Sequence, residues 1–162
     1  MCKKIIVAGG GHGGIAVASI LSRNGYDVTV YEKNSRKNMG YDWTDIFDPK
    51  SLAKANIPMP DKSLFEYKEN MTFYSPDEKT PIKQQVPDDE LEIKMERKDI
   101  YNLLIDTAEK NGVKFIYDCN IESAIIKDNR VVGINTAIGE IYGDLIIDAC
   151  GCESPVRSSL PE

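Results

Sequence analysis

The residues whose types and spacing suggest chemistry most directly are the glycines of residues 9–14, Gly-Gly-Gly-His-Gly-Gly. Gly9, Gly11 and Gly14 have the G-x-G-x-x-G spacing. Because glycine has no side chain, such a loop can turn tightly and bring its backbone close to a pyrophosphate. A helix that begins in the loop directs its free N–H groups and positive dipole end towards the phosphates. The spacing therefore predicts an anion-binding loop.

An acidic residue extends this prediction from phosphate to nucleotide. Glu32 lies 18 residues after Gly14, at the end of the next predicted strand. A carboxylate there can accept hydrogen bonds from both hydroxyls of a ribose, which is the adenosine half of a dinucleotide site. The alternative is a glycine loop that only packs a helix on a sheet. The order strand, glycine loop, helix, strand and acid favours the dinucleotide site.

The elements that must position these residues follow from local patterns. An apolar run predicts a buried strand at 3–8, and the next apolar run, ending at Glu32, predicts a second at 27–32. Between them, residues 13–24 are predicted to form a helix with Gly14, Ala18 and Leu21 on one face. Asn24-Gly25 is a typical helix stop.

Regular structure is predicted again from Arg97. Apolar residues at helical spacing predict an amphipathic helix that ends at Asn111-Gly112. The strands predicted after it are 113–117, an antiparallel meander of 121–127, 130–137 and 140–143, and 145–149. The last of these lacks alternation, which predicts a central parallel strand.

These elements predict an α/β, Rossmann-like dinucleotide-binding fold: a central parallel sheet with a crossover three-stranded antiparallel meander docked on one face. We expect strands 3–8, 28–32, 113–117 and 145–149 to form the sheet. Ligands bind beyond the carboxyl ends of strands in such sheets. The glycine loop, Glu32 and Gly151 all follow such ends, and this convergence supports the predicted site.

The stretch 38–96 holds six of the eight prolines, and we expect it to be mostly irregular. Within it we predict a short helix at 49–55 and strands at Met71–Tyr74 and Leu91–Met95. Long irregular stretches inside small domains usually have a function. This one is either an insertion that covers the ligand or the start of a substrate-facing region.

Composition limits the partners and the compartment. The 162 residues, 41% of them apolar, suffice for one domain with a core, and we treat 1–162 as that domain. A net charge of −6 without a basic cluster disfavours nucleic acid and anionic membrane surfaces. No apolar stretch approaches bilayer length, the N-terminus is a strand and not a signal peptide, and no metal site is predicted. Four cysteines without framework spacing are typical of a reducing cytoplasm.

Three motifs in this order resemble the FAD-binding part of the p-hydroxybenzoate hydroxylase and geranylgeranyl reductase group of flavoproteins. They are the glycine loop with Glu32; Arg97 opening a helix with Tyr101, Leu104 and Ala108 before Gly112-Val113; and Asp148-Ala149-Cys150-Gly151-x-x-Ser154-x-Val156-Arg157. The resemblance covers nearly the whole chain except 41–90. It implies FAD as the cofactor.

Carried over residue by residue, the resemblance places Gly9, Gly11, Gly14 and Glu32 on the ADP moiety. It also implies that Arg97 lies near the pyrophosphate and ribityl chain, that backbone at Asn120-Ile121 faces the adenine, and that Gly40 lies on the loop towards the ribityl chain and flavin ring. We include the neighbouring His12, Gly13, Lys33 and Gly151 in the predicted cofactor-binding set.

Two departures from the group shape the expected function. The hydroxylases have Asp at the position of Cys150, which argues against aromatic hydroxylation by their route and favours the reductase and halogenase-like branches. Members of the group also continue well past the third motif, whereas this sequence stops at Glu162. We therefore expect an N-terminal FAD-binding portion without its substrate-binding half: a truncated form, a degenerate gene or one half of a split enzyme. Exposed apolar surface would favour a second chain or self-association.

Several residues have a simpler interpretation beside the functional one. His12, the only histidine, is either a catalytic base or, as we prefer, a loop residue at the ligand rim. For Cys150 and Cys152, reduced and packed thiols are favoured over a disulfide or redox role. Tyr41-Asp42-Trp43 either contacts the flavin ring or anchors the loop, and Arg97 is either a phosphate ligand, as we prefer, or a surface residue at the helix start.

The leading functional hypothesis is the FAD-binding region of an FAD-dependent oxidoreductase, acting by hydride or oxygen chemistry on an unidentified organic substrate, with catalytic residues unknown. The alternative is a non-catalytic dinucleotide-binding module or a subunit of a split flavoenzyme. A third hypothesis is an NAD(P)-binding domain, although Glu32 disfavours NADP by repelling a 2′-phosphate.

Overall fold

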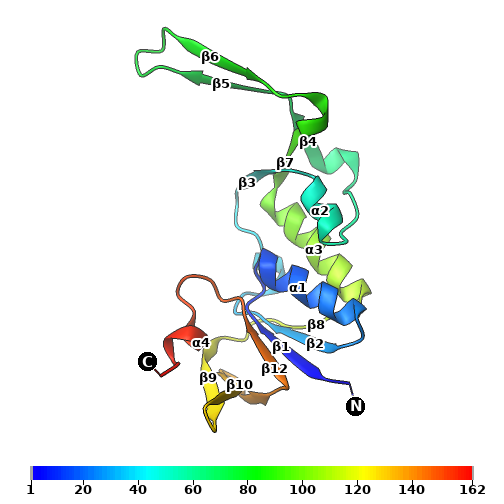
Figure 1. Ribbon diagram of the computed structural model, residues 1–162, viewed down its shortest axis with the longest axis vertical. Helices are drawn as coiled ribbons and strands as arrows, with labels where there is room; N and C mark the ends of the chain where they lie inside the picture. Colours follow the sequence, from blue (N-terminus) through cyan, green and yellow to red (C-terminus); the bar gives the residue numbers. More distant parts are fainter. Residues whose placement is uncertain (1, 162) are drawn as a thin grey trace. The chain divides into compact units, whose positions relative to one another are not determined.

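The computed structural model describes residues 2–161, without the side chains of Asn70 and Gln85. The chain divides into two compact units (Figure 1). The first unit contains the residues up to Met39 together with those from Tyr101 onward, and the second contains Gly40–Ile100. Helix α3 (Arg97–Lys110) begins in the second unit and continues into the first.

The first unit is built on a parallel sheet of four strands in the order β12-β1-β2-β8. Their bounds are β1 Lys4–Ala8, β2 Asp27–Tyr31, β8 Lys114–Ile116 and β12 Leu145–Asp148. All three strand pairs are parallel, as the sequence predicts. In β1 the four residues from Ile5 to Ala8 are all buried, because this inner strand is covered on both faces.

Helix α1 (His12–Arg23) follows β1 and packs Gly14 and Ala18 inward, on the predicted face.

The antiparallel meander consists of β9 (Ile121–Lys127), β10 (Arg130–Thr136) and β11 (Gly139–Tyr142). Its buried residues Ile121, Ala124 and Ile134 form one core cluster with Ile6, Ala8 and Tyr31 of the parallel sheet. The short helix α4 (Pro155–Ser158) follows β12, after the third-motif loop. The Rossmann-like fold with a docked meander is therefore confirmed.

The prediction that 145–149 forms a central strand is wrong. β12 is an edge strand of the described sheet, and Leu145 remains 49% exposed. The apolar run is continuous because successive residues of β12 lie on opposite faces of the sheet, and both faces of this strand carry mainly apolar side chains. Ile146 packs against the core cluster that includes the meander, whereas Leu145 lies on the opposite, less covered face.

The second unit contains more regular structure than the sequence predicts. Its elements are β3 Thr44–Phe47, α2 Lys50–Lys54, β4 Phe65–Lys68, β5 Asn70–Tyr74, β6 Pro81–Gln85 and β7 Glu92–Glu96. Short 3₁₀ turns lie at Lys62–Leu64 and Asp88–Glu90, and another at Arg36–Asn38 in the first unit. The strands form an antiparallel sheet of order β3-β7-β4 and a separate hairpin, β5-β6.

The stretch 38–96 is therefore more regular than expected, and the predicted helix and both predicted strands are present. The missed strands are only four or five residues long, too short for a clear periodic pattern. β3 also pairs with β7 about fifty residues later, with Thr44 opposite Glu96. Such pairing is set by tertiary contacts, including the buried Ile93 and Met95, and not by local propensity.

Gly14 and Gly13 provide a matched test of the helix–strand approach. A Cβ at Gly14 would lie 2.2 Å from the Gly9 carbonyl oxygen, whereas one at Gly13 would meet no described atom within 4 Å. We expect Gly14→Ala to lower the free energy of unfolding by about 1–3 kcal/mol through overpacking. Gly13→Ala should leave it unchanged or raise it by up to about 1 kcal/mol. Urea unfolding measures both, and equal stabilities would contradict the close approach.

Candidate dinucleotide-binding site

The glycine loop is held against the carboxyl ends of neighbouring strands. The Gly9 N–H donates to the Tyr31 carbonyl at 2.9 Å, and the φ of Gly9 is +101°. A Cβ at Gly9 would lie 2.5 Å from the Ala149 carbonyl oxygen. Both the left-handed conformation and the contact with Ala149 require glycine there. Gly9 and Gly14 thus allow β1, α1 and the end of β12 to meet.

Gly11 and Gly13 are glycines for a different reason. No described heavy atom lies within 4 Å of a Cβ built at either residue, so both border open space. Gly11 is the N-cap of α1 and makes no side-chain capping bond, and the first turn has no acidic residue. The beginning of α1 thus combines room, N–H groups and a positive dipole end, the combination that an anion requires.

Glu32 is a buried carboxylate, 6% exposed, that is already bonded to the loop. Its Oε2 accepts from the Gly10 N–H at 2.7 Å, and its Oε1 accepts from the Asn34 N–H and Nδ2 at 2.9 and 2.8 Å. A Cβ at Gly10 would come within 3.1 Å of Oε2. A carboxylate has about four acceptor positions, so capacity remains for a ribose hydroxyl. The sequence did not predict this loop-fixing role. Lys33, the next residue, is exposed.

The segment before β9 lies beside Glu32. The Cys119 N–H donates to the Glu32 carbonyl at 2.9 Å, and the Asp118 N–H donates to the Asn34 carbonyl at 3.2 Å. Ile121 follows two residues later with its side chain in the core, 7% exposed. The structure therefore brings the predicted adenine-facing segment next to the predicted ribose ligand.

The third motif forms a loop that its own side chains hold. Asp148 Oδ2 accepts from the Ser154 hydroxyl at 2.6 Å, and Oδ1 accepts from the Cys150 N–H at 3.1 Å. Ser154 is fully buried, and its oxygen accepts from the Arg157 N–H at the start of α4. Gly151 is exposed and has φ +85°, and a Cβ there would meet no described heavy atom within 4 Å. Asp148 and Ser154 thus shape the loop that presents Gly151.

Cys150 packs beneath this loop as a neutral thiol. Its Sγ donates to the Ala8 carbonyl at 3.3 Å. Burial raises the pKa of Cys150 to about 12, and the negative charge of Asp148 adds to the shift. All four cysteines are free; Cys150 is half-buried and Cys152 exposed. The packed, reduced state that we preferred is present for Cys150, whereas Cys152 is not packed.

His12 is the first residue of α1, and its side chain is exposed. The imidazole lies against Tyr101, with the ring centroids 4.5 Å apart and the planes inclined by 32°. This contact holds the only histidine of the chain at the edge of the glycine loop.

Gly40 and Arg97 form a separate cluster in the second unit. The Arg97 guanidinium donates to Asp45 through Nε at 2.7 Å and through Nη2, and its carbon lies 4.4 Å from the centroid of the Tyr41 ring. This pairing with Asp45 raises the pKa of Arg97. The Arg97 N–H also donates to the Trp43 carbonyl at 2.8 Å.

Gly40 packs on the same helix start. Its φ is +73°, and a Cβ there would lie 2.9 Å from the Cα of Lys98. The structure thus brings Gly40, Tyr41 and Arg97 together. The sequence analysis missed Asp45; the available signal was an acidic residue inside the short strand Thr44–Phe47.

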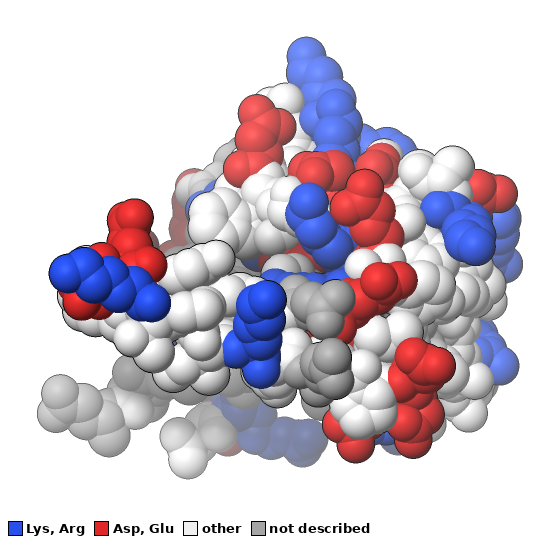
Figure 2. Space-filling model, turned by 90° about the horizontal axis from the view of Figure 1, so that it is seen from above, with Lys and Arg blue, Asp and Glu red and all other residues white. Residues whose placement is uncertain are grey.

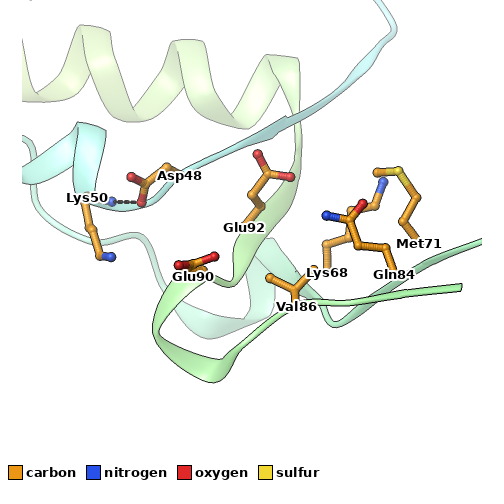
Figure 3. Close-up of a pocket in the computed structure, with 8 residues that line it drawn as sticks. All are labelled: Asp48, Lys50, Lys68, Met71, Gln84, Val86, Glu90 and Glu92. Atoms are coloured by element: carbon orange, nitrogen blue, oxygen red, sulfur yellow. Dashed lines mark hydrogen bonds between the residues drawn. The ribbon is translucent and has the colours of Figure 1, made fainter.

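A pocket of about 350 Å³ lies elsewhere in the second unit (Figure 3). Its lining residues are Asp48, Lys50, Lys68, Met71, Gln84, Val86, Glu90 and Glu92. Three carboxylates and two lysines therefore share one opening, and Asp48 accepts a hydrogen bond from the Lys50 N–H at 2.8 Å. None of the predicted cofactor-binding residues lines this pocket.

Charges of both signs are interspersed on the face that Figure 2 shows, without a large basic area. Among the described residues, no helix is long and apolar enough to span a membrane. In the same part of the chain, no three His, Cys, Asp or Glu side chains are grouped so that they could hold a metal ion.

The parallel sheet, the glycine loop entering α1 and the acidic residue after β2 define a Rossmann-like dinucleotide-binding domain. The comparison with known proteins agrees with this assignment of the domain. Residues 7–54 match the family described as NAD(P)-binding Rossmann-like domain. The chain is 30% identical over 163 residues to a digeranylgeranylglycerophospholipid reductase of Haloferax volcanii, covering 96% of this chain and 37% of the reductase.

Solved structures show the same fold. A geranylgeranyl bacteriochlorophyll reductase-like protein of Thermoplasma acidophilum has a TM-score of 0.81 at 22% identity, over 98% of this chain and 41% of that one. A probable FAD-dependent monooxygenase of Pseudomonas aeruginosa has a TM-score of 0.76 at 17% identity, over 97% and 44%. The resemblance stated from the motifs is confirmed. The chain spans about two fifths of the length of these proteins.

Cys150 and Cys152 should differ sharply in reactivity. Because the thiolate is the reactive form and the pKa of Cys150 is raised to about 12, Cys150 should resist iodoacetamide at about pH 8 in the folded protein. The exposed Cys152 should be alkylated under the same conditions. Peptide mass spectrometry after timed labelling measures both, with urea-unfolded protein as the control in which Cys150 also reacts. Equal rates in the folded protein would contradict the packed, protonated thiol.

Proposed function

We propose that this chain is the FAD-binding region of an FAD-dependent oxidoreductase related to the geranylgeranyl reductases. The observation that carries the proposal is the pairing of the open helix start at Gly11 and Gly13 with the buried carboxylate of Glu32. The first offers room and N–H donors to a pyrophosphate, and the second offers acceptors to a ribose. The resemblance of the three motifs to FAD-binding flavoproteins favours FAD over other dinucleotides, and the chain is similar to the Haloferax volcanii reductase over 96% of its length.

The residues of the first unit would hold the ADP part of FAD. The N–H groups at the start of α1 bind the pyrophosphate, and the remaining lone pair of Glu32 accepts from a ribose hydroxyl. Since Gly10 and Asn34 already fix the Glu32 carboxylate, it is oriented before the nucleotide arrives. Backbone at Asn120-Ile121, beside Glu32 through Cys119, would face the adenine.

The second unit would contribute the ribityl-facing residues and the start of a substrate-facing region. Asp45 accepts from Nε and Nη2 of Arg97 and so holds the guanidinium in place for a phosphate or hydroxyl oxygen of the cofactor. Tyr41 and Trp43 are 66% and 59% exposed in the same cluster, which favours contact with a planar ring over a purely structural role. Bound FAD would supply the hydride or oxygen chemistry, and the protein residues would bind and orient it.

The neutral Cys150 supports the reductase-like branch over aromatic hydroxylation. In the hydroxylases that the chain resembles, a carboxylate stands at this position and is tied to flavin and nicotinamide handling. Here the side chain donates to the Ala8 carbonyl and has no negative charge at neutral pH. We therefore propose reductase-like or halogenase-like flavin chemistry on an organic substrate.

A second candidate is a non-catalytic dinucleotide module or one subunit of a split flavoenzyme. The chain covers 37–45% of the length of the similar proteins, and the redox behaviour of bound flavin separates the two candidates. Reduction of bound flavin followed by reoxidation in air would support the oxidoreductase. Bound nucleotide that undergoes no redox turnover, alone or with candidate second chains, would support the module.

Titration of the chain with FAD, ADP and FMN tests the proposed site. We expect FAD and ADP to bind with affinities within about tenfold of each other, since most identified contacts address the ADP moiety. FMN, which lacks that moiety, should bind undetectably. Isothermal titration calorimetry measures all three. FAD binding far tighter than ADP, or clear FMN binding, would show a complete ring site; absence of FAD and ADP binding would refute the proposal.

Glu32→Ala should weaken FAD and ADP binding by about 1–3 kcal/mol, the scale of a charge-assisted hydrogen bond. It should also lower stability, because the Gly10 and Asn34 donors lose their acceptor. Affinity is therefore measured well below the melting temperature of the variant. Glu69→Ala, at an exposed position, is the control and should change neither quantity. Unchanged ADP affinity in Glu32→Ala would contradict the ribose assignment.

A further inference from the structure

His12 occupies an unusual place for the only histidine of the chain. It is the first residue of α1, between the glycines at 11 and 13 that leave open space. Its exposed ring packs against the Tyr101 ring, and the two ring centroids are 4.5 Å apart. A titratable ring is thus fixed where the proposed pyrophosphate would approach.

The start of a helix penalises a cation and attracts an anion. The imidazole of His12 is at such a helix start. The first turn of α1 contains no acidic residue that would offset this effect. A bound pyrophosphate, with two negative charges beside the ring, acts in the opposite direction and favours the imidazolium.

The charged groups that the structure describes near the loop or near Tyr101 ordinarily titrate outside the range of histidine. The Glu32 carboxylate is bonded to the Gly10 N–H, and the Cys150 thiol is neutral. On α3, the charged side chains within one turn of Tyr101 are Arg97, Lys98 and Asp99. Arg97 is paired with Asp45, and Lys98 and Asp99 have opposite signs. None of these side chains has an ordinary pKa between about pH 5 and 8, the range in which histidine titrates.

We propose that His12 is a pyrophosphate-binding residue that acts as the imidazolium and makes dinucleotide affinity depend on pH. This rests on the proposed function of the glycine loop. Because the pKa of His12 is higher in the complex than in the free protein, the complex binds more protons. Affinity is then greatest below the pKa of the free protein and falls as pH rises through the pKa of the complex.

The experiment uses FAD and ADP-ribose as probes, because the pyrophosphate of each is esterified at both ends and keeps its charge. ADP is unsuitable, since a terminal phosphate has its own pKa near about 6. Calorimetry between about pH 5.5 and about pH 8 should show a fall in affinity of about tenfold, equivalent to a His12 shift of about one pKa unit.

NMR gives an independent readout. With one histidine in the chain, a single imidazole resonance reports the pKa without assignment. Its pKa should be about one unit higher with ADP-ribose bound than in the free protein. An unchanged pKa on binding would overturn the inference.

Two variants at the same position separate charge from shape. His12→Gln should bind both probes at every pH as weakly as the natural protein does near about pH 8. His12→Lys should keep tight binding across the range, because its charge does not titrate there. Circular dichroism verifies that both fold. If His12→Gln retains the full pH dependence, the inference is wrong while the proposed function stands. If neither probe binds the natural protein at any pH, both are wrong.

Discussion

The structure depends on the close approach of backbone at the glycine loop. Gly9 contacts the Ala149 carbonyl and Gly14 contacts the Gly9 carbonyl, at separations that no Cβ can enter. This contact joins the end of β1, the start of α1 and the end of β12. Because a side chain here would push the helix away from the sheet, the open space beside Gly11 and Gly13 exists only while this packing is kept.

Glu32 links that packing to recognition. Its carboxylate is 6% exposed, and the Gly10 and Asn34 donors hold both oxygens. A buried carboxylate without such partners would be costly, so the loop and the strand end stabilise one another. Under the proposed function, the carboxylate is therefore oriented for a ribose before binding, and less ordering remains for the binding step.

The sequence predicts the first unit well because its signals are local. An apolar strand, a glycine loop and helical spacing each occupy neighbouring residues, and the bounds of α1, α3 and the meander follow within a few residues. The edge position of β12, the strands between Gly40 and Ile100 and the Asp45–Arg97 pair could not be predicted. Each depends on pairing between segments far apart in sequence, such as β3 with β7, and short strands carry little pattern of their own.

The two clusters of predicted site residues differ in how they present positive charge. In the second unit, Asp45 neutralises Arg97, so this guanidinium offers hydrogen-bond donors with little net charge. In the first unit the positive potential comes from the backbone at the start of α1, where no acidic side chain opposes it. Under the proposed function, an anionic pyrophosphate would be attracted by this oriented backbone and not by an excess of basic residues, since the net charge of the chain is −6. A single ionisable ring placed there, that of His12, consequently has an influence on anion binding that a surface lysine elsewhere would not have.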